Sequence, residues 1–130
     1  MTSLSKTIKP TDAEMEILQV LWENGPSTVR FVNDRLNEKR NVGYTTTLKI
    51  MQIMNDKGIL TRLKKERTHV YTPVLKEVET QSLLVDKLLK IAFGGSAGKL
   101  VMQTLGNKKT SAEELKKIKD LITNLEKRQK

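Results

Sequence analysis

Apolar residues near the start of the chain recur at intervals of three and four, the spacing of an amphipathic helix. The first such stripe comprises Ile17, Leu18, Leu21 and Trp22. It follows Thr11–Glu14, a capping-box sequence, and ends before Gly25, which accepts the left-handed turn that closes a helix. A second stripe begins after Ser27, the expected N-cap, and a third helix is expected over Thr45–Lys57, with Gly58 ending it. The pattern predicts three short helices in succession.

After Gly58 the pattern changes from helical spacing to alternation, which is typical of strands. We expect one strand over residues 59–63, a polar turn over 64–67 and a second strand over 68–72, closed by Pro73. A two-stranded hairpin is marginally stable alone, so it must pack on the helices. Three helices followed by a hairpin predict a mainly α protein whose residues 1–73 form a winged helix-turn-helix DNA-binding domain.

Beyond Pro73 the helical spacing returns, with a long helix over residues 75–91, a glycine-rich break over 94–98 and a short helix after it. Thr110 or Ser111 is expected to cap a last helix. Few other elements exist to cover the apolar stripes of these helices. We therefore expect residues 74–130 to be a helical dimerisation domain, covered by a second copy of the chain. The residues expected at this homodimer interface are Leu84, Leu88, Leu100, Leu115, Ile118, Leu121, Ile122 and Leu125.

Charge is unevenly distributed along this chain, whose formal net charge is +9. Residues 1–38 carry a slight excess of acidic side chains, whereas residues 39–67 hold eight basic residues against two acidic ones. A dense basic segment is the footprint expected of a nucleic-acid-binding face. An ordinary solvated surface is the alternative interpretation of charge alone.

The start of the third helix is the strongest candidate for reading DNA. In a helix-turn-helix protein, the first residues of this helix face base edges in the major groove. Thr45, Thr46 and Lys49 are therefore expected to contact bases, and Tyr44 to contact phosphate. Thr47 is expected to turn partly inward. The structural alternative is that the threonines cap the helix, and both roles are compatible.

The hairpin is the second candidate. Its basic residues Arg62, Lys64, Lys65 and Arg67 lie on or beside one turn. We expect them to contact DNA phosphates, a contribution that does not depend on base sequence. The alternative is a solvated hairpin whose charged residues deter edge-to-edge aggregation.

Composition argues against several other classes of protein. The chain has no cysteine and a single histidine, His69, so it lacks the usual ligands of a zinc site. His69 also has no nucleophile motif near it, and we expect no catalytic residues, no enzyme activity, no metal and no cofactor. No apolar run approaches the ~18 residues of a membrane span, so we expect no membrane partner and a cytoplasmic location.

Several segments together resemble the penicillinase-repressor family of the BlaI/MecI type, which includes copper-responsive repressors. The matching segments are Thr11–Leu18 with Leu21-Trp22, Tyr44–Leu48, Lys57–Leu60, Arg67 with Val70–Pro73, and Phe93–Ser96. They cover most of the chain in the right order. The resemblance implies a homodimer that binds double-stranded DNA at a palindromic promoter site. It also implies base reading by Thr45 and Thr46, and it matches Arg67 to a wing arginine.

The sequence departs from this family at two places. Copper-responsive members carry a cysteine pair near the C-terminus, and this chain has none, which disfavours copper sensing. Antibiotic-responsive members are cleaved at an Asn-Phe bond before the last helix, where this chain has Gln103-Thr104. The inducing signal, and any protease or sensor partner, is therefore left unidentified.

Two functions are compatible with these patterns. The first is a transcriptional repressor that occludes a promoter as a homodimer. The second is an adaptor that uses the same fold to bind proteins, because a fold does not by itself specify a function. The basic segment over residues 39–67 favours the first, and nucleic acid that copurifies with the protein would distinguish them.

Overall fold

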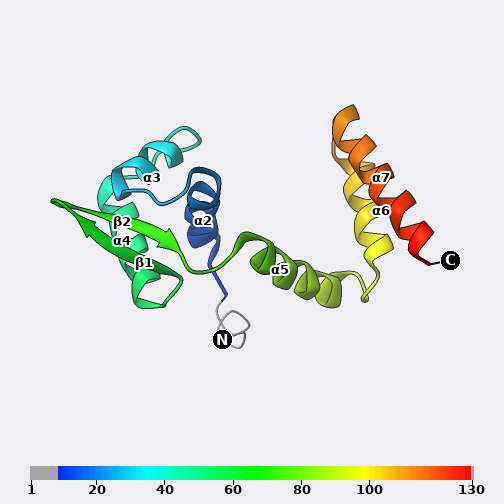
Figure 1. The fold of residues 1–130 in the computed structure, drawn as a ribbon, viewed down its shortest axis with the longest axis horizontal. Helices are drawn as coiled ribbons and strands as arrows, with labels where there is room; N and C mark the ends of the chain where they lie inside the picture. The colour runs from blue at the N-terminus through cyan, green and yellow to red at the C-terminus, as the bar shows by residue number, and fades with distance from the viewer. Residues whose placement is uncertain (1–8, 130) are drawn as a thin grey trace. The chain divides into compact units, whose positions relative to one another are not determined.

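The structure is a computed structural model that describes residues 9–129, so residues 1–8 and 130 of the predicted domains lie outside the described part. Figure 1 shows its elements, whose order confirms the predicted fold class: a winged helix-turn-helix followed by further helices. The elements are α2 (Asp12–Asn24), α3 (Val29–Leu36), α4 (Tyr44–Asp56), β1 (Leu60–Lys65), β2 (Thr68–Pro73), α5 (Glu77–Ala92), α6 (Ala97–Asn107) and α7 (Ala112–Arg128).

The chain divides into two compact units, one ending at Val85 and the other beginning at Asp86. The boundary falls within α5, whereas the sequence placed a functional boundary after Pro73. These units are groups of residues in contact with one another. The assignment of one domain to DNA binding and the other to dimerisation therefore stays a prediction.

The capping box at the start of α2 forms as predicted. The Thr11 hydroxyl accepts from the Glu14 amide at 3.2 Å, and the Glu14 carboxylate accepts from the Thr11 amide at 2.9 Å. Glu14 is buried, and its second oxygen accepts from Lys57 Nζ at 2.8 Å. The Glu14 side chain therefore links the start of α2 to the residue that ends α4.

Thr28, rather than the predicted Ser27, is the N-cap of α3. The Thr28 hydroxyl accepts from the Phe31 amide at 3.1 Å. Ser27 instead pairs with Tyr71 of β2 through two backbone hydrogen bonds of 3.1 and 2.8 Å. Because Ser27 is extended and bonded to the hairpin, the cap falls one residue later. This bridge also ties the hairpin to the connection between α2 and α3.

One hydrophobic core holds the first unit together, and it contains the apolar positions expected from the helical spacing. Helices α2, α3 and α4 pack on one another and on the hairpin. The most deeply buried apolar side chains of this core are Ile17, Leu18, Leu21, Val32, Met51, Met54, Ile59, Leu60 and Tyr71. The hairpin therefore gains its stability from the helices, as the marginal stability of an isolated hairpin requires.

The turn of the hairpin is shorter than predicted. Lys64 and Lys65 belong to β1, where they pair with His69 and Thr68, and only two residues remain in the turn. Its first residue, Glu66, has a φ of 56°. A two-residue hairpin turn requires positive φ at that position because it matches the twist of the strands. The strands extend further than alternation alone indicated because this turn is tight.

The segment after the hairpin is attached to α2. Trp22 Nε1 donates to the Leu75 carbonyl at 2.9 Å, and the Leu75 side chain is buried. Helix α5 begins at Glu77 rather than at the predicted Leu75. Since Leu75 is anchored to the core, the helix begins two residues later.

The second unit contains α6, α7 and the last part of α5. Ser111, one of the two predicted caps, accepts from the Glu114 amide at 3.1 Å and begins α7. Ser96 caps α6 in the same way. Among the described residues of this unit, none is buried. These helices are therefore well formed locally but have no core of their own.

Candidate nucleic-acid interface

The predicted base-contacting residues lie together at the start of α4. Thr45, Thr46 and Lys49 are exposed, and Tyr44 is 39% exposed. Thr47 turns inward as predicted, but it is fully buried rather than partly so. The first turns of α4 therefore present hydroxyl, methyl, phenol and ammonium groups to solvent, which are groups that can bind base edges and phosphates.

The threonines do not cap α4. Its N-cap is Gly43, which supplies no side-chain hydrogen bond, and all three threonines lie inside the helix. The interpretation that they serve as caps is therefore wrong. A helix start without a side-chain cap leaves backbone amides and the positive end of the helix dipole free for an anion. That arrangement suits a phosphate close to Tyr44.

Arg30, which the sequence reasoning missed, lies beside this surface. Its guanidinium carbon is 4.6 Å from the centre of the Tyr44 ring, a cation–π contact between the start of α3 and the start of α4. Arg30 is exposed and can add a positive charge next to the threonines. The count of charge by segment hid it, because residues 1–38 are acidic on balance. The signal that could have identified Arg30 was its position near the start of α3, the first helix of the helix-turn-helix.

The hairpin does not place all its predicted phosphate-binding residues on one face. Alternation along β1 puts Arg62 and Lys64 on the face that carries Tyr71, and Lys65 on the opposite face. Arg67 lies in the turn. All four side chains are exposed. The hairpin therefore offers positive charge on both faces and at its tip, and β1 packs against α4 (Figure 1).

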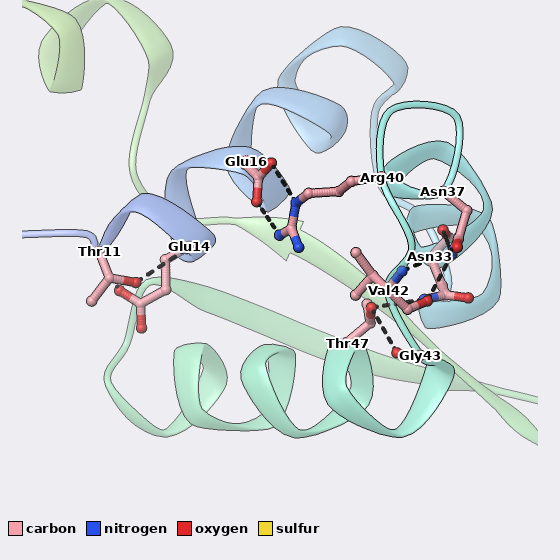
Figure 2. A network of polar contacts seen from close by, with 9 residues as sticks. All are labelled: Thr11, Glu14, Glu16, Asn33, Asn37, Arg40, Val42, Gly43 and Thr47. Atoms are coloured by element: carbon pink, nitrogen blue, oxygen red, sulfur yellow. Dashed lines mark hydrogen bonds and ion pairs between the residues drawn. The ribbon is translucent and has the colours of Figure 1, made fainter.

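Two basic residues of the segment over residues 39–67 are paired inside the first unit. Lys57 pairs with Glu14, and Arg40 binds Glu16, with Arg40 Nε donating to Glu16 Oε2 at 3.2 Å (Figure 2). The hydrogen bond from Arg40 lowers the pKa of Glu16, and the positive charges of Arg40 and Lys39 add to this effect. These pairs hold α2 against the end of α4 and the connection between α3 and α4. The charge available to DNA is therefore smaller than the sequence count suggests.

A group of polar contacts, buried at Asn33 and Thr47, joins α3, α4 and the segment between them (Figure 2). Asn33 Nδ2 donates to Thr47 Oγ1 at 2.8 Å and to the Val42 carbonyl at 3.0 Å. Asn37 Nδ2 donates to the same carbonyl at 2.8 Å, and Asn37 Oδ1 accepts from the Val42 amide at 3.1 Å. The connection between α3 and α4 is thus held by side-chain amides.

The predicted dimerisation residues of the second unit remain partly or largely open to solvent. Leu121 is 57% exposed, Ile122 47% and Leu125 43%. Gln103 and Thr104 lie within α6, where the Thr104 hydroxyl donates to the Leu100 carbonyl at 2.8 Å. The position corresponding to the cleaved bond is therefore part of a regular helix.

Residues 9–129 include no group of three or more histidine, cysteine, aspartate or glutamate side chains suited to a metal ion. In the same part of the chain, every helix is too short or too polar to cross a bilayer.

Comparisons with known proteins show similarity to transcriptional repressors. The sequence profile of the family described as "Penicillinase repressor" matches residues 10–124. A protein of Mycobacterium tuberculosis named "Transcriptional regulator BlaI" is 30% identical over 95 residues, which are 72% of this chain and 69% of that protein. A "Penicillinase repressor" of Bacillus licheniformis is 24% identical over 98% of this chain and 99% of its own length.

A solved structure extends the comparison to the fold. The MarR family protein from Bacillus stearothermophilus has a TM-score of 0.53 and 17% sequence identity, and the match covers 98% of this chain and 81% of that one. At this identity the likeness concerns the fold alone.

Proposed function

Because the chain belongs to the penicillinase repressor family, a family of transcriptional repressors, we propose that it binds a palindromic operator in double-stranded DNA as a homodimer. The observation that carries this proposal is the start of α4, where exposed Thr45 and Thr46 follow an uncapped helix end. Occupation of a promoter by the dimer would block transcription. The predicted cytoplasmic location accords with this role and stays a prediction.

Base recognition is assigned to three side chains of α4. Thr45 and Thr46 offer hydroxyls to base edges and methyl groups to the methyl group of thymine, and Lys49 can donate to guanine. Support comes from their exposure and from the burial of Thr47, which fixes the face that α4 turns outward. An α-helix fits the major groove of B-form DNA, where each base pair is distinguishable.

Phosphate binding is assigned to residues around the base readers. Their shared property is an exposed cation or hydroxyl within the first unit. They are Arg30, Tyr44, Arg62, Lys64, Lys65 and Arg67. Such contacts release condensed cations from DNA, so they produce affinity that falls steeply with salt and depends little on base sequence.

Homodimerisation is assigned to the second unit. Its described residues bury no side chain, although α7 carries an apolar stripe along its length. A continuous exposed apolar face marks a surface that a partner covers. A second copy of the chain supplies the same stripe, and two-fold symmetry of the dimer would match a palindromic site.

The direct test is selection from a pool of random DNA duplexes, followed by fluorescence anisotropy on the enriched sequence and on a scrambled duplex of equal composition. We expect an enriched palindrome and binding that weakens steeply with salt. Thr46→Ala should reduce the preference for the enriched sequence about tenfold. The matched control is Thr123→Ala, which removes an exposed threonine of α7 away from its apolar stripe.

Two results would contradict the proposal. If the protein enriches no sequence and fails to bind duplex DNA at low salt, the repressor function is wrong and the adaptor function is favoured. If light scattering finds a monomer at micromolar concentration, the homodimer is wrong even where DNA binding persists.

A further inference from the structure

Helix α4 begins without a side-chain cap, yet its start is held firmly from the inner side. The Thr47 hydroxyl donates to the carbonyl of the N-cap residue Gly43 at 3.4 Å and accepts from Asn33 Nδ2 at 2.8 Å. The second Asn33 donor binds the carbonyl of Val42, directly before the N-cap. We call these contacts of Asn33, Asn37, Val42, Gly43 and Thr47 the amide network (Figure 2).

Because Asn33 and Thr47 are buried, their hydrogen bonds must be complete and well aligned. Asn33 is 6% exposed and Thr47 is not exposed at all. In such surroundings a hydroxyl or amide without a partner is costly, whereas a complete set of hydrogen bonds specifies one arrangement. Apolar side chains at these positions would fill the space without fixing a direction. The network therefore sets the position of the α4 start relative to α3.

The position of the α4 start matters because Thr47 shares the first turn of the helix with Thr45 and Thr46. Thr47 faces the interior, and the other two threonines face solvent. A shift of Gly43 or a rotation of the first turn would move both groups together, since they belong to one rigid helical turn. Hydrogen bonds to base edges tolerate displacements of only about 0.5 Å, whereas attraction to phosphate charge tolerates more.

We propose that Asn33 and Thr47 are positioning residues for sequence reading: they bind the carbonyl groups of Val42 and Gly43 at the start of α4 and hold Thr45 and Thr46 in register with the bases. This proposal rests on the proposed function. It assigns a role in DNA specificity to two buried side chains that do not touch DNA. It also explains how α4 can leave its outward amides free and still begin at a defined residue.

The sharpest test uses a pair of substitutions at one position. Thr47→Val keeps the shape of the side chain and removes the hydroxyl, whereas Thr47→Ser keeps the hydroxyl and removes the methyl group. Thr80→Val is the matched control, because Thr80 is also buried and its hydroxyl donates to the carbonyl four residues earlier, that of Lys76. Anisotropy would measure each variant on the duplex that the unaltered protein enriches and on its scrambled counterpart.

We expect Thr47→Val to lower the ratio of the two affinities about tenfold while leaving binding to the scrambled duplex and its salt dependence unchanged. Thr47→Ser and Thr80→Val should keep the original ratio. A general loss of folded protein would instead weaken binding to both duplexes by the same factor. A ratio that Thr47→Val leaves intact overturns the positioning role.

A double variant covers the case in which Thr47→Val does not fold, because a buried amide would then lack one partner. Asn33→Leu with Thr47→Val removes both polar groups, which is often nearly neutral for stability. This variant should fold and show the reduced ratio, and an unchanged ratio overturns the proposal. If the unaltered protein itself shows no sequence preference, the proposed function is wrong. If the unaltered protein and the variant show the same preference, only the positioning role is wrong.

Discussion

The two units of the chain differ in where their apolar side chains lie. In the first unit, Leu18 and Val32 are completely buried in a core to which three helices and the hairpin contribute. In the described part of the second unit no side chain is buried, and Met102 is 75% exposed. Short helices are marginal in water without tertiary packing. The first unit therefore carries its own stability, whereas the second needs a covering surface, which we propose is a second copy.

The largest expected effect follows from removing part of the first core. Leu18→Ala should lower the free energy of unfolding by about 2–5 kcal/mol, because it leaves a cavity in a packed interior. Trp22 is the only tryptophan and lies in the first unit, so its fluorescence during urea unfolding reports on that unit. The loss should be the same at low and high protein concentration.

Leu121→Ala provides the matched comparison in the second unit. Leu121 is 57% exposed in the single chain, so its truncation should leave the Trp22 transition nearly unchanged. It should weaken dimerisation instead, so the fraction of dimer that it removes should depend on protein concentration. Equal shifts of the Trp22 transition for both leucine variants would show that the two units do not differ in the way described.

The second expected effect concerns DNA affinity. Ile122→Glu places a charge on the apolar stripe of α7 and should convert the proposed dimer to monomers. Affinity for a two-half-site duplex should fall by at least ~100-fold, because the second half-site is no longer bound within one complex. Light scattering and anisotropy measure the two changes. Thr123→Glu adds the same charge one residue away from the stripe and should leave both values unaltered.

The difference between the units also explains how much could be predicted from the sequence. Helical spacing identified core residues such as Ile17 and Leu21, because the buried face of a helix requires apolar residues at intervals of three and four. The helix starts near Ser27 and Leu75 were harder to predict. A bridge to Tyr71 determines the backbone of Ser27, and a hydrogen bond from Trp22 determines that of Leu75. Contacts between residues far apart in sequence leave no periodic signal.

For the candidate site, the exposed residues were easier to predict than their support. Thr45 and Thr46 stand out because the position of a recognition helix follows from the order of elements. Asn33 does not stand out, because its partner Thr47 is fourteen residues away and neither is charged. Arg30 was hidden by the acidic average of its segment. Sequence reasoning thus found groups that are exposed to solvent and missed groups that contact each other.

The third expected effect tests whether DNA binding belongs to the first unit. Arg67→Ala and Arg30→Ala should each weaken binding to enriched and scrambled duplexes alike, by roughly three- to tenfold at moderate salt. Each should reduce the slope of log affinity against log salt concentration by about one. Lys117→Ala removes an exposed charge from α7 and should change neither value. An equal effect of Lys117→Ala would extend the DNA-binding surface to the second unit.

The smallest expected effect is a pH dependence confined to the first unit. The hydrogen bond from Arg40 lowers the pKa of Glu16 below its ordinary value of 4.5. A carboxyl group with a lowered folded-state pKa stabilises the fold above the unfolded-state value, and this contribution is lost as pH falls through the folded-state value. Glu16→Gln should therefore lower the Trp22-detected stability at neutral pH, and its difference from the unaltered protein should shrink in acid.

This effect is small, because both side chains are partly exposed and water screens the pair. Asp120→Asn is the control in the second unit. Asp120 pairs only locally with Lys116, four residues earlier and at 3.4 Å, so its loss should leave the Trp22 transition unchanged at every pH. A constant difference between Glu16→Gln and the unaltered protein across acid pH would contradict the assignment. The Glu16–Arg40 pair connects distant parts of the first unit, whereas the Lys116–Asp120 pair lies within one helix, and only the former can couple proton binding to that fold.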